Sequence, residues 1–332
     1  MTKFQVQTGG KLYLAGEYAI LTPGQLALIA SIPIYMTAEI SPAKTYDLSS
    51  DMFDYGVDLT PNQDYALIQE TIKNANHYLE SMGLATKPFR LSITGKLERQ
   101  GKKLGIGSSG SVTILVLKAM AAFYQQDWSA DFLFKLASYT LLKLGDNGSM
   151  GDLACIAYDD LVLYQSFDRE KLSAWIAQEP MEVLLAKDWG YEIRIVHPSE
   201  TQYFLVGWTG KPAISKDMIN QVKSAISPAF LSDTKQAVEL IVQALEAGDR
   251  KQLIQQVTRV SDLLEDLHPA IYTADLKRLV AASQGLDAVA KSSGSGGGDC
   301  GIALVFNPVD RQKLIERWQE AGIELISCQD LS

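Results

Sequence analysis

Leu104-Gly105-Ile106-Gly107-Ser108-Ser109-Gly110-Ser111 stands directly before an apolar run at 112–124. The run is apolar on nearly every side, which predicts a buried helix. Glycines let an anion approach the backbone, and the free N–H groups at the start of a helix attract phosphate. The stretch lacks the ending of a Walker A loop and misplaces the third glycine of a dinucleotide fingerprint. It therefore predicts either a phosphate-binding loop of another kind or a flexible loop with a serine cap.

A second loop, Gly-Asp-Asn-Gly-Ser-Met-Gly-Asp at 145–152, ends on Asp152 just before the apolar residues 153–157. A helix is expected to start there, and the N–H groups of its first turn favour a carboxylate anion. Asp152 is therefore either a functional carboxylate or a helix cap.

A third loop, Lys-Ser-Ser-Gly-Ser-Gly-Gly-Gly-Asp-Cys-Gly at 291–301, is expected between a helix and the strand at 302–306. Three consecutive glycines cost backbone entropy on folding. A linker rarely sits between two regular elements, so a ligand loop is favoured. Lys11, in an early predicted strand, is by itself only an edge charge.

Strand and helix patterns alternate along the chain, which predicts a layered α/β or α+β fold. The expected strands are 11–14, 26–40, 89–94, 161–167, 203–208 and 302–306. The expected helices are 65–82, 112–124, 132–144, 216–225, 232–247, 250–267, one ending near 284, and 311–321. A loop is expected at 100–109. A length of 332 residues suits two domains, and a charged stretch at 168–190 suggests 1–190 and 191–332.

The composition excludes several classes of protein. Hydrophobic residues make up 47%, which is ordinary for a globular chain, and the net charge of −9 disfavours nucleic acid and anionic membranes as partners. Three cysteines without zinc or disulfide spacing predict a reducing compartment. The N-terminus has no signal-peptide pattern and no run is long enough to span a membrane. We expect a cytoplasmic protein; a homodimer is one option that the sequence leaves open.

Taken together and in order, three stretches resemble the signature motifs of the GHMP kinases (galactokinase, homoserine kinase, mevalonate kinase and phosphomevalonate kinase). They are Gly-Lys-Leu-Tyr-Leu-Ala-Gly-Glu-Tyr-Ala-Ile-Leu at 10–21, Gly-Ile-Gly-Ser-Ser at 105–109 and Ser-Gly-Ser-Gly-Gly-Gly-Asp at 293–299. The resemblance spans almost the whole chain. It implies an N-terminal ribosomal-protein-S-five-like α/β domain, a C-terminal ferredoxin-like α/β domain, and an active site in the cleft between them that uses ATP and Mg²⁺.

Within the superfamily, the stretches at 16–21, 145–152 and 291–301 look like those of bacterial-type phosphomevalonate kinases. That likeness implies transfer of the ATP γ-phosphoryl group to phosphomevalonate, which gives diphosphomevalonate for isoprenoid synthesis. Mevalonate kinase, another GHMP small-molecule kinase, and an ATP-binding sensor without turnover are the alternatives. A nucleic-acid-binding protein on the same fold conflicts with the acidic charge.

The resemblance also implies residue roles. Lys11 contacts phosphate and acceptor, Asp152 is the active-site aspartate, residues 105–111 hold ATP, and Ser109 is a Mg²⁺ ligand. Candidates for binding the acceptor come from the loops and their neighbours: Lys11, Tyr18, Lys102, Lys103, Asn147, Ser149, Ser215, Ser293, Gly296 and Gly297.

Two departures from the mevalonate kinase pattern argue against that enzyme. Tyr18 stands where mevalonate kinases have His, and Leu141 stands where they have an acidic Mg²⁺ ligand. The metal's protein ligands therefore stay open. A phosphate acceptor, with a second pKa near ~6, is already ionised at neutral pH. We therefore predict that Asp152 orients Lys11 and the metal and does not act as a base.

Overall fold

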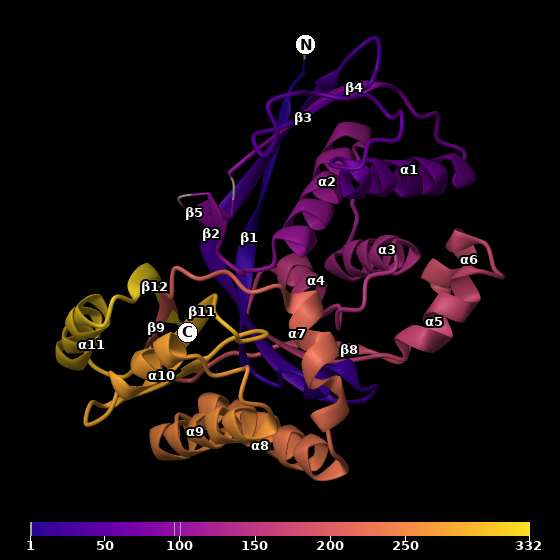
Figure 1. The fold of residues 1–332 in the computed structure, drawn as a ribbon. Helices are drawn as coiled ribbons and strands as arrows, with labels where there is room; N and C mark the ends of the chain where they lie inside the picture. Colours follow the sequence, from indigo (N-terminus) through magenta and orange to yellow (C-terminus); the bar gives the residue numbers. More distant parts are fainter. Residues whose placement is uncertain (1, 96, 100) are drawn as a thin grey trace.

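The first half of the chain is built on a six-stranded sheet (Figure 1). The computed structural model describes residues 2–95, 97–99 and 101–332, so Met1, Lys96 and the first residue of the expected loop, Gln100, lie outside it. The strand order is β3-β4-β2-β7-β8, and β1 pairs with β2. The strands are β1 (Phe4–Ala15), β2 (Leu26–Pro42), β3 (Asp47–Ser50), β4 (Phe89–Thr94), β7 (Val162–Gln165) and β8 (Glu192–Ile195).

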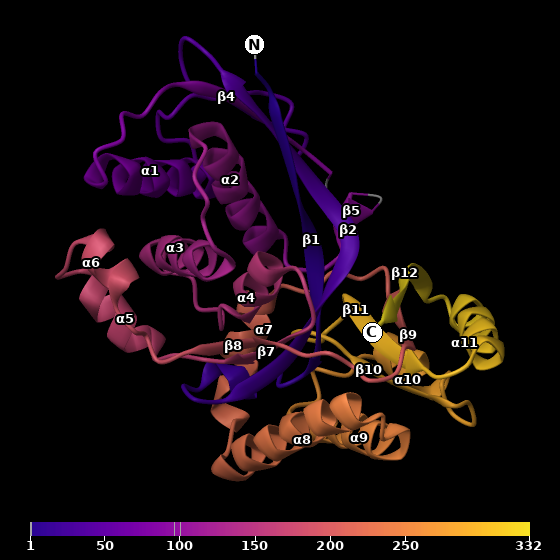
Figure 2. The same cartoon turned by 180° about the vertical axis from the view of Figure 1, so that it is seen from behind.

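Four helices cover one face of this sheet, as Figures 1 and 2 show from opposite sides. They are α1 (Ala66–Ser81), α2 (Ser108–Tyr124), α3 (Ala130–Lys143) and α4 (Gly151–Tyr158). Helix α2 packs against β1, β2, α1, α3 and α4, which explains why it is apolar almost all round. Two short helices, α5 (Arg169–Ile176) and α6 (Met181–Ala186), pack on the outer side of α3.

The second half contains a four-stranded antiparallel sheet in the order β10-β11-β9-β12. Its strands are β9 (Gln202–Trp208), β10 (Ala288–Ser292), β11 (Cys300–Val305) and β12 (Glu324–Leu331). The helices of this half are α7 (Ser215–Val222), α8 (Pro228–Ala247), α9 (Arg250–Leu267), α10 (Ala274–Ala281) and α11 (Pro308–Glu320). Helices α8 and α9 lie side by side in both views (Figures 1 and 2). The layered architecture predicted from the sequence is confirmed.

Two local expectations were wrong in ways that matter for the site. Helix α2 begins at Ser108 and not at 112, so two serines of the glycine-rich stretch belong to its first turn. The third loop was expected between a helix and a strand, but it connects the paired strands β10 and β11. Strand β6 (Lys102–Lys103), within the loop expected at 100–109, pairs with β5 (Glu98–Arg99), which precedes that loop.

The boundary between the halves stays a prediction, and the sheet pairing bears on its position. Strand β8 pairs with β7, so the first sheet uses residues up to Ile195. A boundary after 190 would cut this strand from its sheet, and one shortly after 195 would not.

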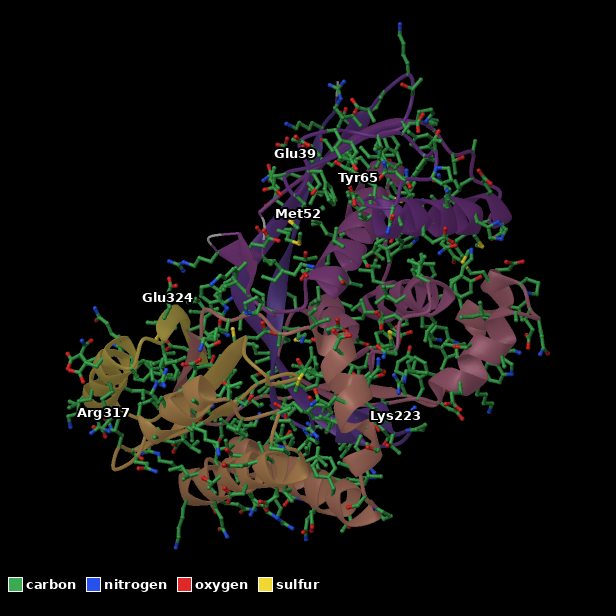
Figure 3. The ribbon with its side chains drawn as sticks, in the orientation of Figure 1. Glu39, Met52, Tyr65, Lys223, Arg317 and Glu324 are labelled. Atoms are coloured by element: carbon green, nitrogen blue, oxygen red, sulfur yellow. The ribbon has the colours of Figure 1, made fainter. Side chains whose placement is uncertain are left out.

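Direct contacts join the two halves. Lys291 of β10 forms an ion pair with Glu17, and Ser293 donates a hydrogen bond to the Tyr13 carbonyl at 2.9 Å. At the rim, Arg99 pairs with Glu324 at 2.7 Å; Figure 3 labels Glu324 beside the small β5 hairpin. Across the described residues, no helix combines the length and the apolar character needed to cross a membrane.

Candidate active site

Three connected hollows form a cleft; two of them are lined by both halves of the molecule and the third by the first half alone. The central hollow has a volume of about 1750 Å³, open solvent included, and its walls include the start of α2, the loop before α4 and the start of α7. A second, the tyrosine hollow, contains Tyr13, Tyr18 and Ser149 and shares Lys11 and Asp152 with the central one. A third, the methionine hollow, contains Met36, Met52 and Phe53 and shares Ser108 and Ser109 with the central one.

The predicted phosphate loop opens into the central hollow. Gly107 precedes α2 with a left-handed backbone (φ 88°), and Ser108 and Ser109 form the first turn of the helix at the wall of the hollow. The first N–H groups of a helix have no partner within the helix, and its dipole is positive at this end. A 17-residue helix that presents this end to a cavity is well suited to bind phosphate.

Three glycines of this loop pack against three charged residues. A Cβ added to Gly105 would lie 2.3 Å from the Asp299 carboxyl carbon, and one added to Gly107 would lie 2.9 Å from Lys11 Cε. A Cβ added to Gly110 would lie 3.0 Å from Asp152 Oδ2. Lys11, Asp152 and Asp299 thus meet around the start of α2.

Lys11 lies on β1 with only 8% of its surface exposed, and its ammonium lies 4.9 Å from the centre of the Tyr13 ring. Among the ion pairs of the described residues, none includes Lys11. Its charge nevertheless acts on Asp152 and Asp299, where it favours the carboxylate anions. Lys11 is therefore a buried cation near two carboxylates, with room beside it for another anion.

Burial raises the pKa of both carboxylates. The pKa of Asp152 rises because its side chain is removed from water, while Lys11 and the Leu153 N–H oppose the rise. The helix start was expected to favour the Asp152 anion; the Leu153 N–H does so, but desolvation has the larger effect on the pKa. Burial raises the pKa of Asp299 to about 6, although the Ala213 N–H donates to its carboxylate.

The tyrosine hollow brings together four of the predicted acceptor residues, namely Lys11, Tyr18, Ser149 and Ser215. Ser149 shares a 3.0 Å hydrogen bond with the Tyr13 hydroxyl, and the Tyr18 hydroxyl donates to the Ser295 carbonyl. Ser215, at the start of α7, lies 3.3 Å from the Ser295 hydroxyl. All of these residues line the same hollow, with residues of both halves on its wall.

Three residues around this cleft have a left-handed backbone without being glycine: Tyr18 (φ 60°), Met150 (φ 66°) and Asp299 (φ 52°). Such a conformation costs on the order of 1–3 kcal/mol for each residue and is concentrated at functional sites. Tyr18 and Asp299 lie in the first and third motifs, and Met150 lies in the loop at 145–152.

Several predicted residues lie away from the cleft lining. The Ser293 hydroxyl is buried against the Tyr13 carbonyl, and the Ser111 hydroxyl is buried against the Gly9 carbonyl at 2.8 Å. Ile106 packs in the core, where its carbonyl accepts from the Lys11 N–H at 2.9 Å. Gly296 and Gly297 pack against Ile271 and Met218, and these contacts help to fix the conformation of the third loop. Their roles in binding remain predictions, and for Ser293 and Ser111 the hydroxyl is already engaged.

Lys103, predicted to contact the acceptor, lines the methionine and central hollows. It is not among the residues that line the tyrosine hollow, whereas Ser149 is. Lys102 donates to the Gly210 carbonyl at 3.0 Å across the domain boundary. Asn147 lines the central hollow, with its amide 3.5 Å from that of Asn220.

Few protein ligands are available for a metal. In the part of the chain that the structure describes, no cluster of three or more His, Cys, Asp or Glu is placed to hold one. Leu141, which stands where mevalonate kinases have an acidic Mg²⁺ ligand, lies on the wall of the central hollow. Ser109 and Asp152 line the same hollow. Mg²⁺ typically binds through one or two protein groups, waters and substrate phosphates, and these residues fit that arrangement.

Four residues of the site were missed by the sequence analysis as functional candidates: Tyr13, Glu17, Ser295 and Asp299. Asp299 and Ser295 stood within the third motif but were given no role. Tyr13 and Glu17 flank the predicted residues Lys11 and Tyr18 in the first motif, and only their position near those residues could have suggested them.

Known families match this chain in both halves. Residues 66–160 match the GHMP kinases N terminal domain, and residues 241–324 match the GHMP kinases C terminal domain. A structure of Streptococcus pneumoniae phosphomevalonate kinase in complex with phosphomevalonate and AMPPNP is 54% identical, with a TM-score of 0.97 over 98% of this chain and 99% of that one.

Two curated relatives agree with this assignment. Phosphomevalonate kinase of Streptomyces sp. (strain CL190) is 29% identical over 95% of this chain and 93% of its own length. Mevalonate kinase of Methanocaldococcus jannaschii is 23% identical over 98% of each chain. The chain belongs to the GHMP kinases. Among these three relatives, both that exceed 25% identity are phosphomevalonate kinases.

Proposed function

We propose that this kinase transfers the γ-phosphoryl group of ATP to 5-phosphomevalonate, giving 5-diphosphomevalonate and ADP. The observation that carries the proposal is the meeting of two hollows at Lys11 and Asp152. One side offers the start of a helix for nucleotide phosphates, and the other a polar, tyrosine-lined space for an acceptor. The high identity to a phosphomevalonate kinase over the full chain supports this choice of acceptor.

The nucleotide would enter from the methionine hollow. Met36, Met52 and Phe53 offer apolar surface for a base, and Figure 3 shows Met52 between the long β1–β2 pair and α2. The phosphates would then reach the first turn of α2, since Ser108 and Ser109 line both hollows. Lys103, on the same side, would contact the nucleotide and not the acceptor.

Mg²⁺ would be held by Ser109, nucleotide phosphate oxygens and the Asp152 carboxylate. When bound, it would neutralise charge on the β- and γ-phosphates. We place the reaction in the cytoplasm. Whether the kinase is a homodimer is to be decided by measuring its molar mass in solution.

The acceptor would lie in the tyrosine hollow, with Ser149, Ser215 and Tyr18 as hydrogen-bonding groups. A phosphate oxygen of the acceptor attacks the γ-phosphorus, the bond from this phosphorus to the β–γ bridging oxygen breaks, and ADP leaves with that electron pair. No proton has to leave the attacking oxygen, because the monoester is already ionised at neutral pH.

Charge repulsion is the main obstacle to this reaction. Two unit negative charges ~4 Å apart repel by about 4 kcal/mol at an effective dielectric constant of ~20. Lys11 would offset this repulsion as a buried cation between donor and acceptor. Asp152 would keep Lys11 oriented and would share the metal.

The experiment is a coupled assay of ADP release with Mg-ATP and each of three acceptors: mevalonate, phosphomevalonate and homoserine. We expect turnover with phosphomevalonate alone. The Lys11→Met variant, prepared in parallel, controls for contaminating kinases. Turnover with mevalonate alone would support mevalonate kinase instead, and ATP binding without turnover on any acceptor would support a sensor.

A further inference from the structure

The guanidinium of Arg169 binds backbone carbonyls of two segments that line or adjoin the tyrosine hollow. Arg169 is the first residue of α5, outside the three motifs. It donates to the carbonyls of Asn147 (2.8 Å) and Gly148 in the second loop, and to the Leu21 carbonyl (2.6 Å) at the end of the first motif. Leu21 and Gly148 both line the tyrosine hollow. One side chain thus joins two walls of that hollow.

Within the part of the chain that the structure describes, the charge of Arg169 has no carboxylate partner. No ion pair of the described residues includes it, and all three of its hydrogen bonds go to carbonyls. Burial lowers its pKa, opposed by Asp146, Glu170 and the tyrosines Tyr13 and Tyr164. A partly buried guanidinium held only by carbonyls is costly, so a stability role alone explains it poorly.

The next carbonyl of the loop is held in the same way. The buried Tyr164 hydroxyl donates to the Ser149 carbonyl at 3.0 Å. Three consecutive carbonyls, those of residues 147–149, are therefore bound by side chains from β7 and α5. With its carbonyls engaged, the loop presents Ser149 at the tyrosine hollow, where its hydroxyl meets Tyr13.

We propose that Arg169 is a positioning residue for the acceptor, acting through the loop at 147–149 and through Leu21. The inference rests on the proposed function, because it takes the tyrosine hollow as the acceptor site. Arg169 does not line either hollow that would hold the nucleotide. Asn147 and Gly148, whose carbonyls it binds, do line the central hollow. The loss of Arg169 should therefore weaken acceptor binding more than nucleotide binding.

The experiment measures KM for acceptor and for ATP, and kcat, in Arg169→Gln and Arg169→Lys. Losing hydrogen bonds from a charged donor should raise KM for the acceptor about 10- to 100-fold, while KM for ATP stays within about two-fold. A lysine at this position would keep the charge but not the fork of donors, so Arg169→Lys should resemble Arg169→Gln. Arg259→Gln is the matched control, because Arg259 pairs with Asp233 at the surface and should change neither constant.

Chemical rescue adds a readout that a general loss of stability would not give. Free guanidinium at millimolar concentration should restore acceptor KM in Arg169→Ala, and should not affect the wild type. Equal changes in both KM values, absence of rescue, or variants that unfold at the assay temperature by circular dichroism would overturn the positioning role. The wild-type assay on the three acceptors tests the proposed function separately, and the variants are compared on whichever acceptor the wild type uses.

Discussion

Lys291 and Glu17 form a completely buried ion pair across the two halves of the molecule. The Lys291 ammonium also donates to the Ser292 carbonyl at 2.6 Å, whereas the second Glu17 oxygen, Oε2, is buried and has no hydrogen-bond partner among the described residues. Burial lowers the pKa of Lys291, and Glu17 opposes that effect. The pair ties the strand before the third loop to the loop after β1, and so connects two motifs of the site.

Removing one partner of this pair should strongly destabilise the protein. We expect Lys291→Met to lower the free energy of unfolding by about 3–5 kcal/mol, because Glu17 is left as an uncompensated buried charge. Urea denaturation measures this. The double variant Glu17→Gln/Lys291→Met should recover part of the loss, since no buried charge remains.

Lys277→Met is the control for that experiment. Lys277 pairs with Glu265 at 2.6 Å, but both side chains are about half exposed. Its loss should cost no more than about 1 kcal/mol. A similar cost for Lys277→Met and Lys291→Met would contradict the special role given to burial.

Lys11 should be essential for turnover. Lys11→Met removes the buried cation at the junction of the two hollows, and kcat should fall at least ~100-fold, the scale of one lost preorganised charge-stabilising donor. Lys3→Met, which alters an exposed pair with Glu39, should leave kcat unchanged. Near-normal turnover of a folded Lys11→Met variant would show that Lys11 has no role in the reaction and is only a charged residue of β1.

Asp152→Asn tests whether the carboxylate is a base. The substitution keeps the shape and one oxygen but removes the charge, so kcat should fall. If Asp152 only orients Lys11 and the metal, kcat against pH above pH 7 should be as flat for the variant as for the wild type, with the acceptor saturating. Burial raises the pKa of Asp152, so base catalysis would produce a wild-type rate that rises with pH through this pKa. Loss of such a rise in Asp152→Asn would identify a base and would favour an alcohol acceptor.

Asp299 should make stability depend on pH. Its pKa is about 6 in the folded protein and 3.8 in the reference state, so folding binds a proton more tightly. The contribution of Asp299 to the free energy of unfolding is therefore greatest below about pH 4, and it is lost as pH rises through about 6. The difference corresponds to about 3 kcal/mol at pH 7, by order of magnitude. We expect Asp299→Asn to be more stable than the wild type at pH 7 and equally stable near pH 4, by urea denaturation at both pH values. A variant less stable at pH 7 would show that the interactions of the negative charge with Lys11 and the Ala213 N–H outweigh its desolvation.

The sequence predicted the long elements well because their patterns are strong. The helix at 250–267 and the strand at 89–94 have the predicted bounds, and the helix at 65–82 differs by one residue at each end. Short elements were missed where tertiary pairing decides them. Strand β10 has five residues, all of them buried, so its sequence shows no alternation of polar and apolar residues. Only its pairing with β11 across the glycine-rich turn identifies it as a strand.

The site was predictable where a motif carried it and not elsewhere. Lys11, Asp152 and Ser109 lie together as the motifs implied. Ser293 belongs to a motif, but its hydroxyl is used inside the fold, which no spacing can reveal. Arg169 lies outside every motif, and its contacts join two segments that are 21 and 148 residues away in sequence from it. Such a role depends on the folded path of the chain.

The packing of Gly105, Gly107 and Gly110 against Asp299, Lys11 and Asp152 constrains how this sequence can change over time. Each glycine packs against a charged side chain, and Gly105 and Gly107 also have left-handed φ values, so selection that keeps these three charges also tends to keep the three glycines. In a duplicated copy relieved of its function, a shorter residue at 11 would remove the steric contact at 107, but the left-handed backbone of Gly107 would still disfavour a side chain there. Substitution at 107 together with an intact Lys11 should therefore be rare among natural descendants of this chain.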